Sequence, residues 1–118
     1  MKLQSFSKQE RLYKKKLIDG IFKEGKSFNI SPFRVIVQPN PDQSGLVNQV
    51  LFTVPSKIFK RAVDRNLLKR RMREVYRMNK SAITVTTKLL LAYIYTSREI
   101  LPFEVIREKM IKSFERLK

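Results

Sequence analysis

The chain contains neither cysteine nor histidine among its 118 residues. Without cysteine it can form no disulfide, no zinc ribbon and no thiolate nucleophile. Without histidine it lacks the commonest general base, any Ser-His-Asp arrangement and the usual ligand of transition metals. These two absences exclude several common classes of enzyme and metalloprotein.

Acidic residues and glycines are also scarce. The ten Asp and Glu residues are scattered, and none forms a D-x-D or D-E cluster of the kind that holds paired Mg²⁺ ions. The three glycines, Gly20, Gly25 and Gly45, stand apart, so the sequence has no glycine-rich phosphate loop. We therefore expect a binding protein, with no catalytic residue and no metal site of its own.

Long apolar runs are missing as well. The longest strongly apolar run, residues 88–94, is far too short to span a membrane. Residues 1–16 contain no apolar segment of the kind found in signal peptides. The sequence thus predicts a cytoplasmic protein with no membrane partner.

Positive charge is abundant. Lys and Arg number 26 against ten acids, which gives a net charge of +16 and an isoelectric point near 10.5. A hydrophobic content of 42% indicates a folded domain rather than a basic tail. A bound polyanion relieves the repulsion among these positive charges. The release of counterions from the polyanion makes nucleic-acid binding strong and salt-sensitive. Surface lysines that only aid solubility are the simpler alternative, but such surfaces usually mix both signs.

The surplus is concentrated in residues 57–80, which hold ten of the 26 cations against two acids. On a helical wheel, one arc of roughly 140° carries mostly cations: Arg65, Asn66, Lys69, Arg70, Arg73 and Arg77. A neighbouring arc of roughly 100° is mainly apolar: Leu68, Met72, Val75 and Tyr76. A helix of this kind can pack its apolar face on a fold and offer the cations to nucleic acid. A merely solvated face would alternate charge sign at i,i+4, and this one does not.

The remaining patterns place this helix in one α+β domain over residues 1–118. An apolar stripe predicts a first helix that stops at Gly25. β-Branched or apolar runs predict strands at 28–30, 33–38, 48–54 and 89–95, and helical spacing resumes after Pro102. The predicted architecture is a two-layer sandwich of about four strands and three helices in the order α-β-β-β-α-β-α.

Two interpretations of the N-terminus stay open. Ser7 and Glu10 have capping-box spacing, which would start a helix there. Alternatively the first helix begins near Lys14, and residues 1–13 form a flexible basic arm.

A second surface could combine the first helix with the sheet. Strand alternation puts Arg34 and Ile36 on one face, where they could oppose Ile18 and Phe22 across a groove. A groove that is both apolar and cationic suits single-stranded nucleic acid. Apolar residues at helical spacing, such as Ile18 and Phe22, are more often part of a core, so both interpretations stay open.

Several of these residues resemble the protein component of bacterial ribonuclease P. The resemblance rests on Ser56-Lys57, on AVDRNLLKRRMRE at 62–74, and on RLYKKKLIDGIFKEGKSF at 11–28. It implies an α+β fold with the basic helix in a left-handed βαβ crossover. It also implies a monomeric protein that assists a catalytic RNA, with Mg²⁺ bound mainly by that RNA, in cleaving the 5′ leader from precursor tRNA.

The resemblance also assigns residues to surfaces. Carried over by position, the residues that face the catalytic RNA are Lys57, Arg65, Asn66, Lys69, Arg70 and Arg73. Lys60 and Arg61 in the approach loop, and Arg77 on the same arc, complete the predicted RNA-binding surface. The leader cleft is lined by Ile18, Phe22, Arg34 and Ile36.

The chain departs from the family pattern at Leu67, where the motif usually has an arginine; Arg71 nearby is a candidate substitute. The cleft is also less aromatic than the family leads one to expect. A small ribosomal protein is the alternative function. A DNA-binding helix is weaker, because no helix-turn-helix pattern precedes Arg65.

Overall fold

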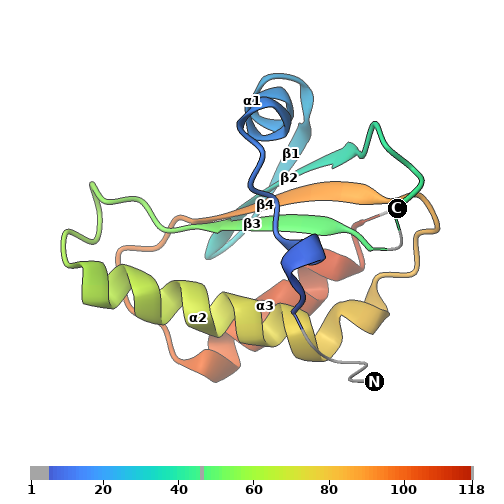
Figure 1. Cartoon of the computed structure of the whole chain (residues 1–118). Coiled ribbons are helices and arrows are strands. Elements are labelled where there is room, and N and C mark those ends of the chain that lie inside the picture. The colour runs from blue at the N-terminus through green and yellow to red at the C-terminus, as the bar shows by residue number, and fades with distance from the viewer. Residues whose placement is uncertain (1–5, 46, 118) are drawn as a thin grey trace.

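The computed structural model describes residues 6–45 and 47–117 (Figure 1). Its main elements are α1 (Lys15–Glu24), β1 (Lys26–Ile30), β2 (Phe33–Pro39), β3 (Gln49–Thr53), α2 (Ala62–Asn79), β4 (Leu89–Tyr95) and α3 (Phe103–Phe114). Single 3₁₀ turns, η1 (Lys8–Glu10) and η2 (Lys80–Ala82), precede α1 and follow α2. The α+β class and the predicted order of helices and strands are confirmed.

The four strands form one mixed sheet in the order β1-β2-β4-β3. β1 pairs with β2, and β2 with β4, in antiparallel fashion, whereas β3 and β4 are parallel. Two parallel neighbours need a long crossover connection, and here α2 provides it. The basic helix is therefore the helix of a βαβ unit, as the resemblance implies.

Helices cover both faces of this sheet, so the structure has three layers where the sequence suggested two. Figure 1 shows α1 on one side of the sheet, with α2 and α3 on the other. On the α1 side, Ile21 packs with Ile36, Leu90 and Ala92 in a small cluster. The larger cluster joins the opposite face of the sheet to α2 and α3.

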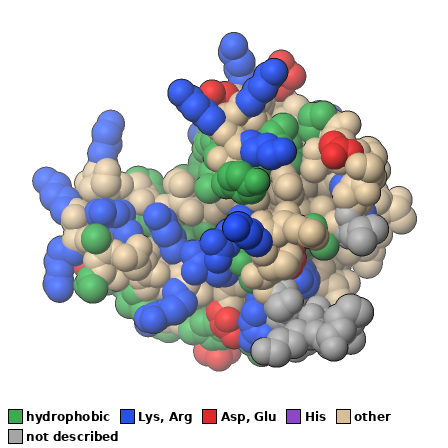
Figure 2. Space-filling view, viewed as in Figure 1, with side chains coloured by type: hydrophobic (Ala, Val, Ile, Leu, Met, Phe, Trp, Pro, Cys, Tyr) green, Lys and Arg blue, Asp and Glu red, His purple; other side chains and the backbone are tan. Residues whose placement is uncertain are grey.

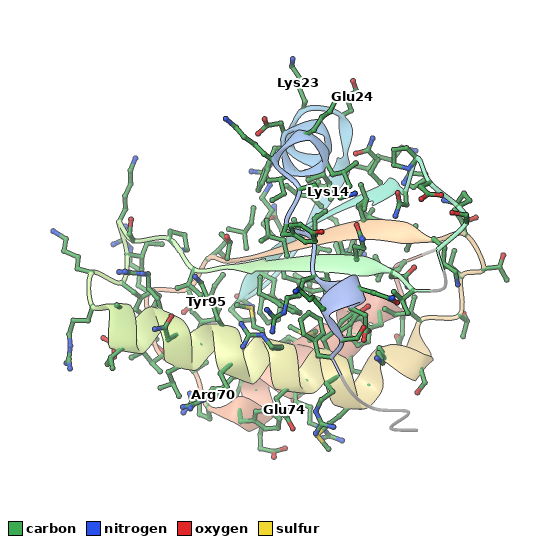
Figure 3. All side chains as sticks on the ribbon, in the orientation of Figure 1. Lys14, Lys23, Glu24, Arg70, Glu74 and Tyr95 are labelled. Carbon is green, nitrogen blue, oxygen red and sulfur yellow. The ribbon has the colours of Figure 1, made fainter. Side chains whose placement is uncertain are left out.

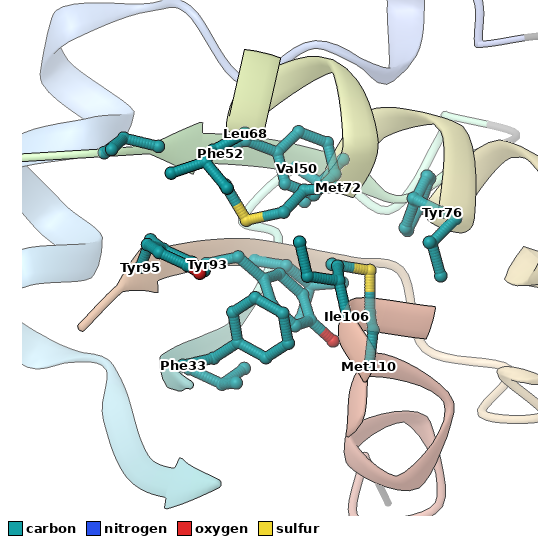
Figure 4. Close-up of a cluster of buried hydrophobic side chains, with 14 of the residues drawn as sticks. Phe33, Val50, Phe52, Leu68, Met72, Tyr76, Tyr93, Tyr95, Ile106 and Met110 are labelled. Carbon is teal, nitrogen blue, oxygen red and sulfur yellow. The ribbon is translucent and has the colours of Figure 1, made fainter. Parts of the chain in front are cut away.

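The larger cluster is rich in aromatic rings (Figure 4). Tyr93 lies at its centre, with its ring centroid 5.7 Å from Phe33 and 5.9 Å from Phe52. The Tyr93 hydroxyl lies 2.7 Å from Ser113 Oγ, which gives the buried phenol a hydrogen-bond partner. These packed rings hold α2 and α3 rigidly against the sheet.

Residues 6–13 pack against this body and do not form a flexible arm; residues 1–5 of the predicted arm lie outside the described residues. The Phe6 ring contacts the rings of Phe52 and Tyr76. Leu12 is 3% exposed, and its backbone N–H donates to Val50 O at 3.0 Å. The capping-box spacing at Ser7 therefore starts only the turn η1, and α1 begins at Lys15.

Candidate nucleic-acid interface

The orientation of α2 is set by its apolar face. Leu68, Met72, Val75 and Tyr76 are the buried residues of this helix, as the wheel predicted. Their burial against the sheet and α3 turns the neighbouring cationic arc outward. In Figure 2, Lys and Arg side chains gather along α2 and around the loop that leads into it.

The predicted RNA-binding residues differ in exposure. Six are exposed: Lys57, Lys60, Arg61, Asn66, Arg70 and Arg73. Three are partly buried: Arg65, Lys69 and Arg77. Figure 3 shows Arg70 pointing outward from α2. The structure therefore places all nine on α2 or on its approach loop, and six of them at the open surface.

Arg65 has a structural contact that the sequence did not reveal. Its Nη1 atom donates to Phe59 O at 2.7 Å and to Lys60 O at 2.9 Å. One guanidinium nitrogen thus ties the approach loop to the first turns of α2. Because Lys57, Lys60 and Arg61 lie in that loop, Arg65 helps to hold their backbone in place.

Two other arginines of α2 are engaged by protein groups. Arg77 forms an ion pair with Glu74, and this hydrogen bond lowers the pKa of the Glu74 carboxyl. Arg71 Nη1 donates to Leu101 O at 2.6 Å, which holds the guanidinium beside the loop before α3. Arg71 is partly buried, so it offers less exposed surface than Arg70 or Arg73 as a substitute for the arginine that the family motif has at position 67.

The predicted leader cleft is only partly open. Ile36 is 2% exposed and packs under α1, so it cannot line an open cleft, and its role is to support the helix. Strand alternation showed that Ile36 and Arg34 share a face, but not which of them α1 would cover. Phe22 is 49% exposed, Arg34 is exposed and Ile18 is partly buried, so these three remain at or near the surface.

The uncovered part of this sheet face lies beside Arg34. Arg34 pairs with Ile94 across β2 and β4, and Ile94 with Thr53 across β4 and β3. Side chains of directly paired residues lie on the same face. Arg34, Ile94 and Thr53 therefore form a row next to the buried row of Ile36 and Ala92. The exposed Arg34 stands at one end of this row, and Ile94 and Thr53 are partly exposed.

A hollow of roughly 390 Å³ lies at the edge strand β3, between the N-terminal segment and α2. Three cations line this hollow: Arg11, which precedes α1, and Lys69 and Arg73 of α2. Tyr13 and Leu51 supply apolar surface. The sequence patterns do not single out Arg11 and Tyr13, because residues 1–13 are equally compatible with a flexible arm. The run from Arg11 to Lys16, in which Leu12 and Tyr13 are flanked by basic residues, is the signal that could have found them.

Among residues 6–45 and 47–117, no group of three or more Asp and Glu side chains is placed to hold a metal ion. Within the same ranges, no helix is long and apolar enough to cross a membrane.

Fold and surface together define a class: an α+β domain that presents a cationic helix for nucleic-acid binding. A family model described as Ribonuclease P matches residues 6–118. The ribonuclease P protein component of Porphyromonas gingivalis is 34% identical over 116 residues, covering 94% of this chain and 85% of that protein. That of Thermotoga maritima is 32% identical over 117 residues, covering 97% of each. The chain belongs to the ribonuclease P protein family.

Solved structures agree with this assignment. The RNase P protein from Thermotoga maritima matches with a TM-score of 0.78 at 29% identity, covering 92% of this chain and 98% of that one. The Staphylococcus aureus RNase P protein matches with a TM-score of 0.77 at 23% identity, which supports the fold alone. The family match does not favour the ribosomal-protein alternative.

Proposed function

We propose that the chain acts as the RNA-binding subunit of the ribonuclease P ribonucleoprotein. In this role it assists a catalytic RNA in the Mg²⁺-dependent removal of the 5′ leader from precursor tRNA. The observation that carries the proposal is the orientation of α2, whose buried apolar face turns a row of cations outward. Family membership supplies the identity of the RNA partner.

The first part of the mechanism is electrostatic. Exposed cations such as Lys57, Arg70 and Arg73 would contact phosphates of the catalytic RNA, with Arg forming two hydrogen bonds where geometry allows. Asn66 is exposed on the same face and can both donate and accept hydrogen bonds, which suits a sugar or base edge. Neutralised phosphates repel one another less, so the folded RNA needs less Mg²⁺. The Mg²⁺ ions themselves would be held mainly by the RNA.

The second part is leader binding on the α1 side of the sheet. The half-exposed Phe22 ring offers a face on which a base can stack, and Arg34 offers a charge for a phosphate. Ile18 adds apolar surface, whereas the buried Ile36 holds α1 in place. Part of the proposal is that the protein works as a monomer within a cytoplasmic ribonucleoprotein.

Reconstitution with bacterial ribonuclease P RNA tests the proposal. Adding the wild-type chain should lower the Mg²⁺ concentration at which precursor tRNA is cleaved at half its maximal rate. Cleavage kinetics that stay unchanged by the protein at every Mg²⁺ concentration would overturn it.

The leader contact is tested separately, by comparing precursor tRNA with mature tRNA. Phe22→Ala should weaken binding of the precursor only, because the mature tRNA has no leader. Val105→Ala is the matched control, since it removes an exposed apolar side chain from α3. Equal binding of the precursor by the Phe22 variant and the wild type would remove Phe22 from the leader site.

A further inference from the structure

Tyr13 differs from the other three tyrosines of the chain. Tyr76, Tyr93 and Tyr95 are at most 1% exposed, whereas Tyr13 is 66% exposed. A single exposed aromatic side chain needs no explanation by itself. The position of Tyr13 among cations and hollows is what sets it apart.

Tyr13 lies on the wall of two hollows. The first is the hollow already described, which Lys69 and Arg73 of α2 also line. The second, of roughly 610 Å³, lies between the N-terminal segment and the loop after β2, with Lys8, Lys14 and Asn40 on its wall. The surface is therefore hollowed on both sides of one tyrosine, from the cationic helix to the loop that follows β2.

The backbone on both sides of Tyr13 is fixed. The preceding residue, Leu12, is buried and bonded to the edge strand β3. The following residue, Lys14, accepts a hydrogen bond from Ile18 N at 3.0 Å at the start of α1. An aromatic ring on a fixed backbone loses little conformational entropy when a ligand stacks on it, which favours binding.

The second hollow contains groups for both parts of a nucleotide. Lys8 and Lys14 offer charge for phosphates. Asn40, Asp42 and Gln49 offer hydrogen-bonding groups for base edges. The Asp42 carboxylate accepts hydrogen bonds from Ser44 N and Ser44 Oγ, which lower the pKa of Asp42 and keep it ionised. This end of the hollow therefore favours a base amino group over a phosphate.

We propose that Tyr13 is the stacking platform of a second subsite for single-stranded RNA, separate from the surface formed by Phe22 and Arg34. Its ligand is a further stretch of the 5′ leader, beyond the nucleotides that lie against α1. This inference rests on the proposed function for the identity of the strand. The chemistry of the subsite, a ring flanked by cations and amides, requires only a single-stranded polynucleotide.

The test uses the assembled ribonucleoprotein and two precursor tRNAs, with leaders of about four and about twelve nucleotides, a span typical of single-strand sites. Tyr13→Ala should weaken binding of the long-leader precursor by about five- to a hundredfold, the usual effect of losing one base stack. Binding of the short-leader precursor should not change. Tyr13→Phe should bind both precursors like the wild type, since the ring is kept. Ile100→Ala, at a side chain 42% exposed, is the control for loss of surface apolar area.

Two results would overturn the subsite. One is wild-type affinity of Tyr13→Ala for the long leader. The other is an equal loss for both leaders, which would place Tyr13 against the tRNA body or the catalytic RNA.

Failure of the proposed function has a different signature, because the wild-type chain would then not stimulate cleavage at all. In that case the isolated chain and a single-stranded RNA oligonucleotide decide the question by fluorescence anisotropy. Weaker binding by Tyr13→Ala, with binding kept by Tyr13→Phe, supports the subsite; equal binding by all three proteins overturns it.

Discussion

Lys80 Nζ lies 2.8 Å from Oε2 and 2.9 Å from Oε1 of Glu10, a residue 70 positions earlier in the chain. The Glu10 side chain is 3% exposed and that of Lys80 is 24% exposed, so the pair is largely shielded from water. Ser7 N also donates to the Glu10 carboxylate, at 2.9 Å. The pair joins the N-terminal segment to the turn after α2. It thereby keeps Arg11 beside Val50 at the edge strand β3, an edge that would otherwise be open to association.

Glu10→Gln should destabilise the protein by about 3 kcal/mol, because it removes a carboxylate that neutralises Lys80 where both side chains are largely shielded from water. Urea denaturation gives the free energy of unfolding. The double variant Glu10→Gln with Lys80→Met should recover part of the loss, since the shielded lysine charge is then removed as well. Glu24→Gln, at an exposed carboxylate that points away from the protein in Figure 3, is the neutral control. Stability equal to wild type in the single variant would mean that the pair contributes nothing.

The two glycines of the first helical region should respond in opposite directions to alanine. A Cβ atom at Gly25 would meet Ile21 O at 2.5 Å and Ile36 Cγ2 at 2.6 Å, so Gly25→Ala should destabilise by about 1–3 kcal/mol. A Cβ atom at Gly20 would meet nothing within 4 Å, so Gly20→Ala should stabilise the helix by about 1 kcal/mol. Thermal unfolding of both variants measures the difference. Melting temperatures that move in the same direction would contradict the packing at Gly25.

Local periodicity made much of the fold predictable. The buried face of α2, from Leu68 to Tyr76, follows from helical spacing alone, and the runs at 33–38 and 89–95 follow from β-branched and apolar content. These features depend on residues close together in the chain, which a pattern can detect.

Features that depend on distant residues could not be predicted in this way. The burial of Ile36 depends on where α1 lies on the sheet, and the pairing of Glu10 with Lys80 joins segments 70 positions apart. The contacts of Arg65 depend on loop carbonyls, which every residue type possesses. A pattern of side chains contains no information about such an acceptor.

Arg65→Lys should loosen the approach loop while it conserves the charge. The lysine ammonium lies one atom nearer the backbone than arginine Nη1, so it falls short of Phe59 O and Lys60 O, and we expect a loss of about 1–2 kcal/mol and faster amide exchange over 58–61. Hydrogen exchange followed by mass spectrometry reports on that loop directly. Asn66→Ala, one position further along α2 and exposed, should leave the exchange unchanged. Wild-type exchange in the Arg65 variant would show that the two hydrogen bonds do not order the loop.

Buried phenols should make the protein less stable at alkaline pH. Burial raises the pKa of Tyr93 and of Tyr76 well above the ordinary value, and the Glu10 charge raises that of Tyr76 further. A group whose pKa is raised by folding contributes its full stability below the unfolded value, about 10, and loses it as the pH rises towards the folded value. The free energy of unfolding should therefore fall above pH 10, by about 1.4 kcal/mol per pH unit for each such phenol.

Tyr93→Phe isolates one of these contributions. Loss of the hydroxyl and its contact with Ser113 lowers the free energy of unfolding equally at every pH. Loss of the ionisable phenol makes the fall in the free energy of unfolding above pH 10 shallower. Deprotonation of lysines affects both proteins alike and cancels in the difference between them. Parallel curves for the variant and the wild type between pH 9 and pH 11.5 would contradict the assignment.

The cationic face of α2 and the mixed-charge surface of α3 provide a matched pair for the salt dependence of RNA binding. Arg70 and Arg73 are exposed on α2, whereas Arg107 and Lys112 are exposed on α3, where they pair with Glu104 and Glu108. Each phosphate contact contributes about one unit to the slope of log affinity against log salt concentration. Arg70→Ala with Arg73→Ala should therefore lower that slope by about two units and weaken binding to the ribonuclease P RNA.

Arg107→Ala with Lys112→Ala removes the same charge and should leave the slope unchanged, because net charge alone does not place a cation against a phosphate. Equal slopes for the two double variants would mean that the RNA is attracted by the total charge of the protein and not by the face that α2 presents.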